Sequence, residues 1–119
     1  MFQRSWWLAN FFVSCINKPM KEIKDADFLK LDKVGKKILL LYSNSCALCN
    51  PVFHSLIELE KQYNEIKFMQ IDSSINKKII SEFGIVGVPC VLFLNDNQVK
   101  IYHGARTKEE YIKILSQQN

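Results

Sequence analysis

Residues 39–49 read Leu-Leu-Leu-Tyr-Ser-Asn-Ser-Cys-Ala-Leu-Cys, so a continuous apolar run leads through a polar turn into a C-x-x-C motif. The run begins at Ile38 and follows two lysines, and a short apolar run with polar ends is typical of a central strand buried on both faces. From Cys46 to Tyr63 the apolar residues recur at helical spacing, at positions 49, 52, 53, 56, 59 and 63. The stretch therefore predicts a buried strand, a tight turn and a helix that begins at Cys46.

Cys46, the first cysteine of this motif, lies where a thiol ionises easily. A thiol at the start of a helix meets free backbone N–H groups and the positive end of the helix dipole, which lower its pKa below the ordinary value of about 8.5. Cys49 follows Cys46 by one helical turn, on the same side and within disulfide reach. The spacing predicts that Cys46 attacks a substrate disulfide and that Cys49 then resolves the mixed disulfide.

A zinc site and an inert structural pair are the two other interpretations of this motif. The chain has four cysteines, at positions 15, 46, 49 and 90, which are too few for a disulfide-stabilised scaffold. Zinc needs four ligands at close range, and although Cys90 offers a third, the sequence shows no fourth. We therefore expect no metal at the pair, and thiol–disulfide exchange requires no other cofactor.

The rest of the chain alternates between strand and helix patterns. The expected elements are strands at residues 20–23, 38–42, 66–71, 90–94 and 99–103, and helices at 25–34, 46–63, 75–83 and from 107 onward. In the last helix, Thr107 and Glu110 fit a capping box, and Tyr111, Ile112 and Leu115 are expected to face inward. This β-α-β-α-β-α-β-β-α order predicts an α/β domain with a mixed central sheet flanked by helices on both faces.

Two motifs carry a resemblance to a known family. Residues 39–49 look like the active-site strand and turn of thioredoxins and protein disulfide isomerase domains, and residues 83–89, Phe-Gly-Ile-Val-Gly-Val-Pro, resemble that family's loop with the cis-proline. The resemblance covers about residues 20–117 and implies a thioredoxin fold. It also implies a protein-disulfide oxidoreductase that uses Cys46 and Cys49 on protein thiols and disulfides.

The resemblance also implies roles for residues outside the C-x-x-C motif. A cis Val88–Pro89 bond would bring its loop beside Cys46, where the backbone of Val88 pairs with an extended substrate segment; an ordinary trans turn is the other interpretation. Arg106 matches a family arginine thought to swing toward the resolving cysteine and lower its pKa, and its alternative is a surface cation near a helix start.

Several positions depart from the family pattern. The usual tryptophan before the first cysteine is Ser45, and the family's buried acid beneath the resolving cysteine is Leu40. The dipeptide Ala47-Leu48 contains no histidine that would stabilise the Cys46 thiolate. These departures favour a second hypothesis, a weakly active or inactive thioredoxin-fold binding or structural module.

Cys90 replaces the threonine that usually follows the cis-proline in the family. By this resemblance its thiol would sit near Cys46 and Cys49. It is interpreted either as a small buried hydrophobe or as a third redox thiol that modulates the pair.

Residues 1–19 form a hydrophobic segment that precedes the thioredoxin-like domain at residues 20–119. As a helix its apolar stretch, residues 6–16, would be about 17 Å long, too short for the roughly 30 Å of hydrocarbon in a bilayer. Three interpretations remain: a secretory signal, an interfacial membrane helix, and a helix packed on this domain or on a partner. Membrane or partner contact would use four aromatic residues, Trp6, Trp7, Phe11 and Phe12. A secretory or membrane-associated location is slightly favoured over the cytoplasm.

The net charge of the chain is +4, from sixteen Lys and Arg residues against twelve Asp and Glu. The basic residues are interspersed with acids, and no dense basic stripe with aromatic residues is present. Nucleic acid is therefore not an expected partner.

Overall fold

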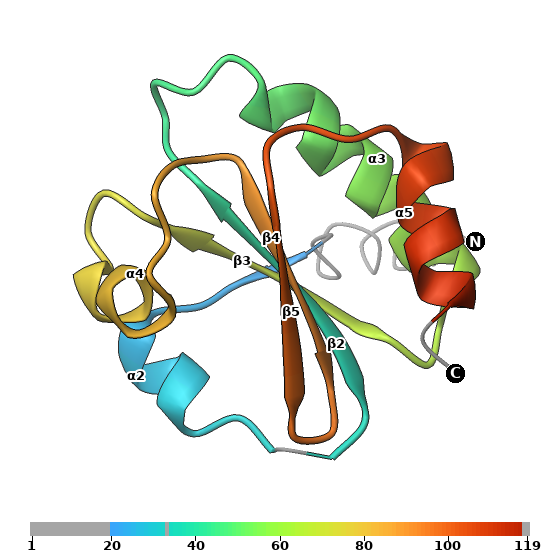
Figure 1. Ribbon diagram of the computed structural model, residues 1–119, viewed down its shortest axis with the longest axis horizontal. Helices are drawn as coiled ribbons and strands as arrows, with labels where there is room; N and C mark the ends of the chain where they lie inside the picture. Colours follow the sequence, from blue (N-terminus) through green and yellow to red (C-terminus); the bar gives the residue numbers. More distant parts are fainter. Residues whose placement is uncertain (1–19, 33, 118–119) are drawn as a thin grey trace, which may run out of the picture.

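The computed structural model describes residues 20–32 and 34–117 (Figure 1). Its strands are β1 (Lys21–Glu22), β2 (Lys36–Tyr42), β3 (Lys67–Asp72), β4 (Cys90–Asn95) and β5 (Gln98–His103). Its helices are α2 (Asp25–Leu29), α3 (Cys49–Gln62), α4 (Lys77–Phe83) and α5 (Lys108–Ser116). The predicted order of strands and helices is confirmed, and the extra hydrophobic helix expected within residues 1–19 lies outside the described residues.

The five strands form one mixed sheet with the order β1-β3-β2-β4-β5. β2 pairs in parallel with β3, opposing Leu40 to Gln70, and antiparallel with β4, opposing Leu41 to Cys90. The apolar run of the C-x-x-C stretch is therefore a central strand, as its composition predicts.

Successive side chains of β2 point to opposite faces of the sheet and enter two separate cores. Ile38 and Leu40 belong to the core under α3 and α5, whereas Leu39 and Leu41 belong to the core under α2 and α4. Figure 1 shows these two pairs of helices on opposite sides of the sheet. The predicted layering, with helices on both faces, is confirmed.

The helix that follows β2 starts later than predicted, at Cys49 instead of Cys46. Pro51 explains the difference, because a proline ring inside a helix clashes with the carbonyl four residues earlier, which here is that of Ala47. With the start at Cys49, Pro51 falls in the first turn, where a missing N–H is tolerated. Cys46 consequently lies in the turn before the helix.

Helices α2 and α4 are also shorter than predicted. α2 ends at Leu29, and Val34, expected on its inner face, is exposed. The Asp32 carboxylate accepts a hydrogen bond from the Val34 N–H at 3.1 Å, a local turn that competes with further helix. α4 starts after Asn76, whose side chain accepts from the Asp25 N–H and donates to the Asp72 carbonyl.

The last helix follows the sequence prediction closely. The Glu110 N–H donates to the Thr107 hydroxyl at 3.1 Å, and the Thr107 N–H donates to the Glu110 carboxylate at 2.8 Å, so the predicted capping box is present. Tyr111 and Leu115 are buried and Ile112 is half-buried. α5 therefore packs on the sheet through the face that its spacing predicts.

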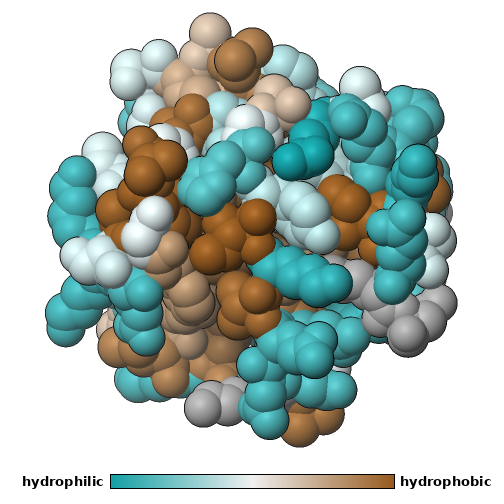
Figure 2. All heavy atoms as spheres, viewed as in Figure 1, coloured by the Kyte–Doolittle hydropathy of each residue, from teal (hydrophilic) through white to brown (hydrophobic). Residues whose placement is uncertain are grey.

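The surface carries both polar and apolar side chains. Figure 2 shows apolar atoms between polar ones on the face that α2, α4 and β5 present to the viewer. Among residues 20–32 and 34–117, no helix combines the length and the apolar character that crossing a bilayer requires.

Candidate active site at the C-x-x-C motif

Cys46 and Cys49 form a disulfide across the turn between β2 and α3, with their Cα atoms 5.4 Å apart. The turn is closed by its own backbone: the Cys46 N–H donates to the Ser43 carbonyl at 3.2 Å, and the Cys49 N–H donates to the Cys46 carbonyl at 3.3 Å. The predicted proximity of the two cysteines is therefore confirmed.

The two cysteines differ in accessibility. Cys49, the first residue of α3, is 5% exposed, whereas Cys46 is only half-buried. Between them, Leu48 is 60% exposed. An approaching thiol or disulfide therefore reaches Cys46 before Cys49.

A cavity of about 240 Å³ lies beside the disulfide. Its lining comes from β2, β3, the connecting turn and the first turns of α3: Leu40, Tyr42, Ser43, Asn44, Cys46, Cys49, Asn50, Phe53 and Gln70. None of these side chains is acidic. Leu40, at the position of the family's buried acid, is 1% exposed and belongs to the apolar core.

The second predicted motif ends at the same end of the sheet as the C-x-x-C turn. The Val88–Pro89 peptide bond is cis, as the resemblance implies. Because Leu41 opposes Cys90 in the antiparallel pair, Pro89 comes opposite Tyr42, the last residue of β2. Figure 1 shows the connection before β4 next to the connection after β2. Pro89 itself is buried, and its carbonyl accepts from the Gly104 N–H at 2.9 Å.

Arg106 lies near the start of α3. It lines a cavity of about 520 Å³ together with Pro51 and Val52, and its guanidinium carbon is 5.1 Å from the centre of the Tyr102 ring. Its Nε atom and the Tyr111 hydroxyl are the two buried side-chain polar atoms without a hydrogen-bond partner in the described part of the chain. The structure therefore brings Arg106 to the helix that carries Cys49.

The fully buried Cys90 side chain faces the core under α2 and α4, whereas the cavity beside the pair is lined from the other face of the sheet by Leu40. The alternation of side chains along β4 causes this, since Cys90 opposes Leu41 and not Leu40. Burial raises the pKa of the Cys90 thiol to about 11.

We expect Cys90 to be unreactive in the folded protein. At pH 8 a thiol with a pKa of about 11 is almost entirely protonated, and only the thiolate reacts readily. Alkylation of Cys90 by iodoacetamide, followed by peptide mass mapping, should be at least about 100-fold slower than in the guanidinium-unfolded chain. Equal rates, or an oxidised form in which Cys90 is bonded to Cys46, would contradict this expectation.

No group of three or more His, Cys, Asp or Glu side chains comes together among residues 20–32 and 34–117 in a way that suits a metal ion.

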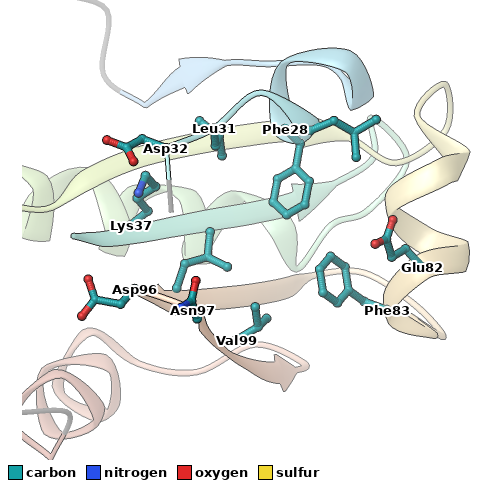
Figure 3. Close-up of a pocket in the computed structure, with 11 residues that line it drawn as sticks. Phe28, Leu31, Asp32, Lys37, Glu82, Phe83, Asp96, Asn97 and Val99 are labelled. Carbon is teal, nitrogen blue, oxygen red and sulfur yellow. The ribbon is translucent and has the colours of Figure 1, made fainter. Parts of the chain in front are cut away.

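Another cavity, of about 470 Å³, lies on the side of the sheet that carries α2 and α4. Figure 3 shows Phe28 and Phe83 pointing into it, and their ring centres are 5.7 Å apart in an edge-to-face arrangement. Lys37, which lines the same cavity, donates to the Val34 carbonyl at 2.8 Å. Sequence reasoning did not anticipate this cavity, because its walls come from segments that no motif connects.

Sequence reasoning also missed a contact next to the pair. Tyr42 lines the cavity of the disulfide, and its hydroxyl lies 2.9 Å from both carboxylate oxygens of Glu22 on β1. The only signal in the sequence is a tyrosine at the end of an apolar strand, and nothing there identifies its partner twenty residues earlier.

A mixed sheet with this strand order, a disulfide at the start of the first long helix and a cis-proline opposite it define the class of thioredoxin-fold proteins with a redox-active cysteine pair. A family model described as Thioredoxin matches residues 18–117. The chain belongs to the thioredoxin family.

The relatives of the chain include both small thioredoxins and parts of larger proteins. It is 27% identical over 99 residues to thioredoxin of Listeria monocytogenes, covering 82% of this chain and 96% of that protein. It is 32% identical over 81 residues to NADPH-dependent thioredoxin reductase 3 of Arabidopsis thaliana and 31% identical over 72 residues to protein disulfide-isomerase TMX3 of Xenopus laevis. These matches cover 66% and 60% of this chain but only 15% and 16% of the two longer proteins.

A solved structure agrees with the fold. The crystal structure of chloroplastic thioredoxin z superposes with a TM-score of 0.74 at 15% sequence identity, covering 84% of this chain and 94% of that one. At this identity the likeness shows the fold alone.

Proposed function

We propose that this protein exchanges disulfides with protein substrates, with Cys46 as the nucleophile and Cys49 as the resolving thiol. The observation that carries the proposal is the disulfide between a half-buried Cys46 and an almost fully buried Cys49, at the start of α3. Reduction of insulin by the purified protein, compared with reduction by its Cys46→Ser variant, tests the proposal.

The exchange proceeds in two substitutions at sulfur. The Cys46 thiolate attacks one sulfur of the substrate disulfide, forms a mixed disulfide and releases the other substrate sulfur as a thiolate. The Cys49 thiolate then attacks the Cys46 sulfur, which forms the Cys46–Cys49 bond and releases the second substrate thiolate. The substrate gains two electrons and the protein loses two, so no cofactor takes part.

The position of Cys46 supports its role as the attacking thiol. It precedes a fourteen-residue helix, whose unpaired N–H groups and dipole favour a negative charge near its first turn. Oxidised substrate can also reach it, since Ala47 and Leu48 beside it are exposed.

Val88 and Pro89 are proposed to bind the substrate backbone. They lie at the end of the sheet from which the C-x-x-C turn leaves, and Val88 is half-buried. An extended segment laid along Val88 would gain backbone hydrogen bonds as an added strand does. Exposed apolar side chains at this end, Ile75 and Val86, would contact side chains of the same segment.

Arg106 is proposed to modulate the pair through its cationic side chain. It shares a cavity with Pro51 and Val52, both in the first turns of α3, and a cation near Cys49 favours that residue's thiolate. Cys90 is assigned a weaker influence, because its thiol is buried in the core under α2 and α4.

The redox potential of the pair is expected to be lower, and therefore less oxidising, than the roughly −180 mV of protein disulfide isomerase. The dipeptide between the cysteines carries no histidine, and neither His54 nor His103 lines the cavity of the pair. With the Cys46 thiolate less stabilised, the disulfide form is relatively favoured. Equilibration with glutathione buffers, followed by quantification of free thiols, measures the potential.

The variant Leu48→His is compared with the unaltered protein in this measurement, because it places a histidine between the two cysteines at a position that is exposed. It should raise the potential above that of the unaltered protein. A value for the unaltered protein well above −180 mV, or no change in Leu48→His, would show that the dipeptide does not set the potential.

A second candidate function is a thioredoxin-fold module with weak or no activity, and the burial of Leu40 where the family has an acid favours it. In this case insulin reduction would be the same with and without Cys46.

In either case we propose that residues 1–19 are separate from the domain at 20–119. We further propose that they bring it to a membrane or partner protein through Trp6, Trp7, Phe11 and Phe12.

A further inference from the structure

The resolving step needs a base, and the cavity beside Cys49 holds none among its own side chains. A thiol with an ordinary pKa of about 8.5 is mostly protonated at neutral pH, so Cys49 must lose a proton before it attacks. The position under it is occupied by Leu40, whose side chain takes no proton. The other groups that line the cavity are amides, hydroxyls and a phenyl ring.

A carboxylate is nevertheless connected to this cavity by a hydrogen bond from one of the residues that line it. Tyr42 lines the cavity together with Cys49, and its hydroxyl points at the Glu22 carboxylate, 2.9 Å from each oxygen. Tyr42 lies two residues after Leu40 on β2, so its side chain is on the same face of the sheet as Leu40 and α3. Glu22 is on the edge strand β1 and is exposed, so it exchanges protons with solvent.

We propose that Tyr42 and Glu22 form a proton relay that deprotonates Cys49 during the resolving step, in place of the buried acid that Leu40 replaces. The proposal rests on the proposed exchange function, since it concerns the second step of that reaction. Tyr42 lines the cavity, and Glu22 accepts the proton that Tyr42 passes on, so Glu22 itself does not contact Cys49.

The relay keeps protons and electrons in balance. A cavity of about 240 Å³ admits water, which accepts the Cys49 proton while it donates a proton to the Tyr42 oxygen. Tyr42 passes its own hydroxyl proton to the Glu22 carboxylate, which later releases it to solvent. The Cys49 thiolate attacks the Cys46 sulfur, the Cys46–substrate bond breaks, and the electron pair leaves on the substrate sulfur.

The groups around Tyr42 favour Glu22 as the acceptor. The titratable groups that face Tyr42 are Glu22 on β1, Asp72 on β3 and the two cysteines, and the other residues that α3 contributes to the cavity wall, Asn50 and Phe53, do not titrate. One carboxylate oxygen of Asp72 already accepts from the Ser74 N–H and hydroxyl, at 3.0 and 2.7 Å. Burial, the hydrogen bond to Glu22 and the charges of Glu22 and Asp72 raise the pKa of Tyr42, so its hydroxyl keeps the proton that a relay passes on.

The resolving step can be followed directly with one equivalent of 5,5′-dithiobis(2-nitrobenzoate) added to reduced protein in a stopped-flow instrument. Attack by Cys46 releases the first thionitrobenzoate, and attack by Cys49 on the Cys46 sulfur releases the second. All proteins carry Cys15→Ser, so that this thiol does not compete. The variants are Glu22→Gln, which keeps an acceptor for Tyr42 but no base, and Tyr42→Phe, which keeps the ring.

At pH 6 both variants should slow the second release at least about 100-fold, the lower end of the range expected for loss of a general base. At pH 10 the difference should shrink to within twofold, because Cys49 then ionises without a base. A purely structural defect would slow the step by the same factor at both pH values and would overturn the proposal. Glu65→Gln, which removes an exposed carboxylate after α3, is the matched control and should leave both releases unchanged.

The variant Asp72→Asn shows which of the two carboxylates near Tyr42, that of Glu22 or that of Asp72, accepts the proton. If Asp72→Asn reproduces the loss at pH 6 and Glu22→Gln does not, Glu22 is not the acceptor and the proposal fails. The first release tests the exchange function independently, because its absence in the unaltered protein refutes the proposed function. A normal first release, with a second release that each variant slows by the same factor at pH 6 and pH 10, refutes only the relay.

Discussion

Replacing Cys46 by serine is expected to reduce insulin reduction to the uncatalysed rate, a loss of at least about 100-fold. The sulfur of residue 46 forms the first bond to substrate, and a serine hydroxyl at the same place does not ionise near neutral pH. Cys46 is also the more accessible half of the disulfide, so Cys49, at 5% exposed, does not take over the attack. The measurement is the turbidity of insulin with dithiothreitol as the reductant.

Two further variants show that the loss is chemical. Cys49→Ser should still attack substrate but should accumulate a mixed disulfide with Cys46, which is visible as an added mass on the intact protein. Cys90→Ala should keep activity, because Cys90 is on the other side of the sheet from the cavity of the pair. Equal insulin reduction by Cys46→Ser and the unaltered protein would instead establish the inactive-module function.

The strand and the turn could be predicted from sequence because each depends on local chemistry, whereas the cis-proline is implied by the resemblance of residues 83–89 to the family's loop. Five apolar residues between lysines and a polar turn specify a buried strand wherever they occur. The capping box of α5 is equally local, since Thr107 and Glu110 are three residues apart. Such features need no knowledge of the rest of the chain.

The start of α3 is predictable in principle, but the apolar spacing alone puts it at Cys46, three residues before the observed start at Cys49. The apolar spacing that includes Cys49 and Val52 fits a helix from either start, and only the steric requirement of Pro51 distinguishes them. The apolar periodicity predicts which face of the helix is buried, whereas Pro51 indicates where the regular helical hydrogen bonding of α3 begins. The second signal decides that Cys46 lies in the turn, outside the helix.

The Tyr42–Glu22 contact and the placement of Cys90 depend on the register of the sheet. The parallel pairings of β3 with β1 and with β2 bring Glu22 within reach of Tyr42. The antiparallel pairing of β2 with β4 decides that Cys90 opposes Leu41 and therefore points away from α3. A shift of one residue in either pairing would reverse the faces. The local sequence patterns predict the strands but not the register in which they pair, so neither the Tyr42–Glu22 contact nor the face of Cys90 could be predicted from them.

The position of Leu40 connects the core to the chemistry. It packs in the core under α3, and the same side chain lines the cavity of the disulfide. An acid there would carry an uncompensated charge among apolar neighbours, which costs stability unless the charge is paired. An apolar residue avoids this cost and leaves the deprotonation of Cys49 to groups nearer the solvent, which is the role we assign to Tyr42 and Glu22.

Replacing Phe93 by alanine is expected to lower the free energy of unfolding by about 3–5 kcal/mol, the range for removal of a buried phenyl ring. Phe93 is 1% exposed on β4, and its ring centre lies 5.2 Å from that of Tyr102 on β5 and 6.1 Å from that of Tyr111 on α5. It therefore joins three elements of the core under α3 and α5. Because domains are stable by only about 5–15 kcal/mol, the variant should lose a large part of its stability.

Urea unfolding followed by circular dichroism measures this change, and the midpoint should fall by about 2 M if the slope is unchanged. Phe93→Leu keeps most of the volume and should cost less than about 1.5 kcal/mol. Val99→Ala, on the partly exposed β5, should change stability by no more than about 0.5 kcal/mol. A loss below about 1 kcal/mol in Phe93→Ala would mean that the rings of Tyr102 and Tyr111 close the gap, and that the core holding α5 against the sheet is less tightly packed than the contacts of Phe93 imply.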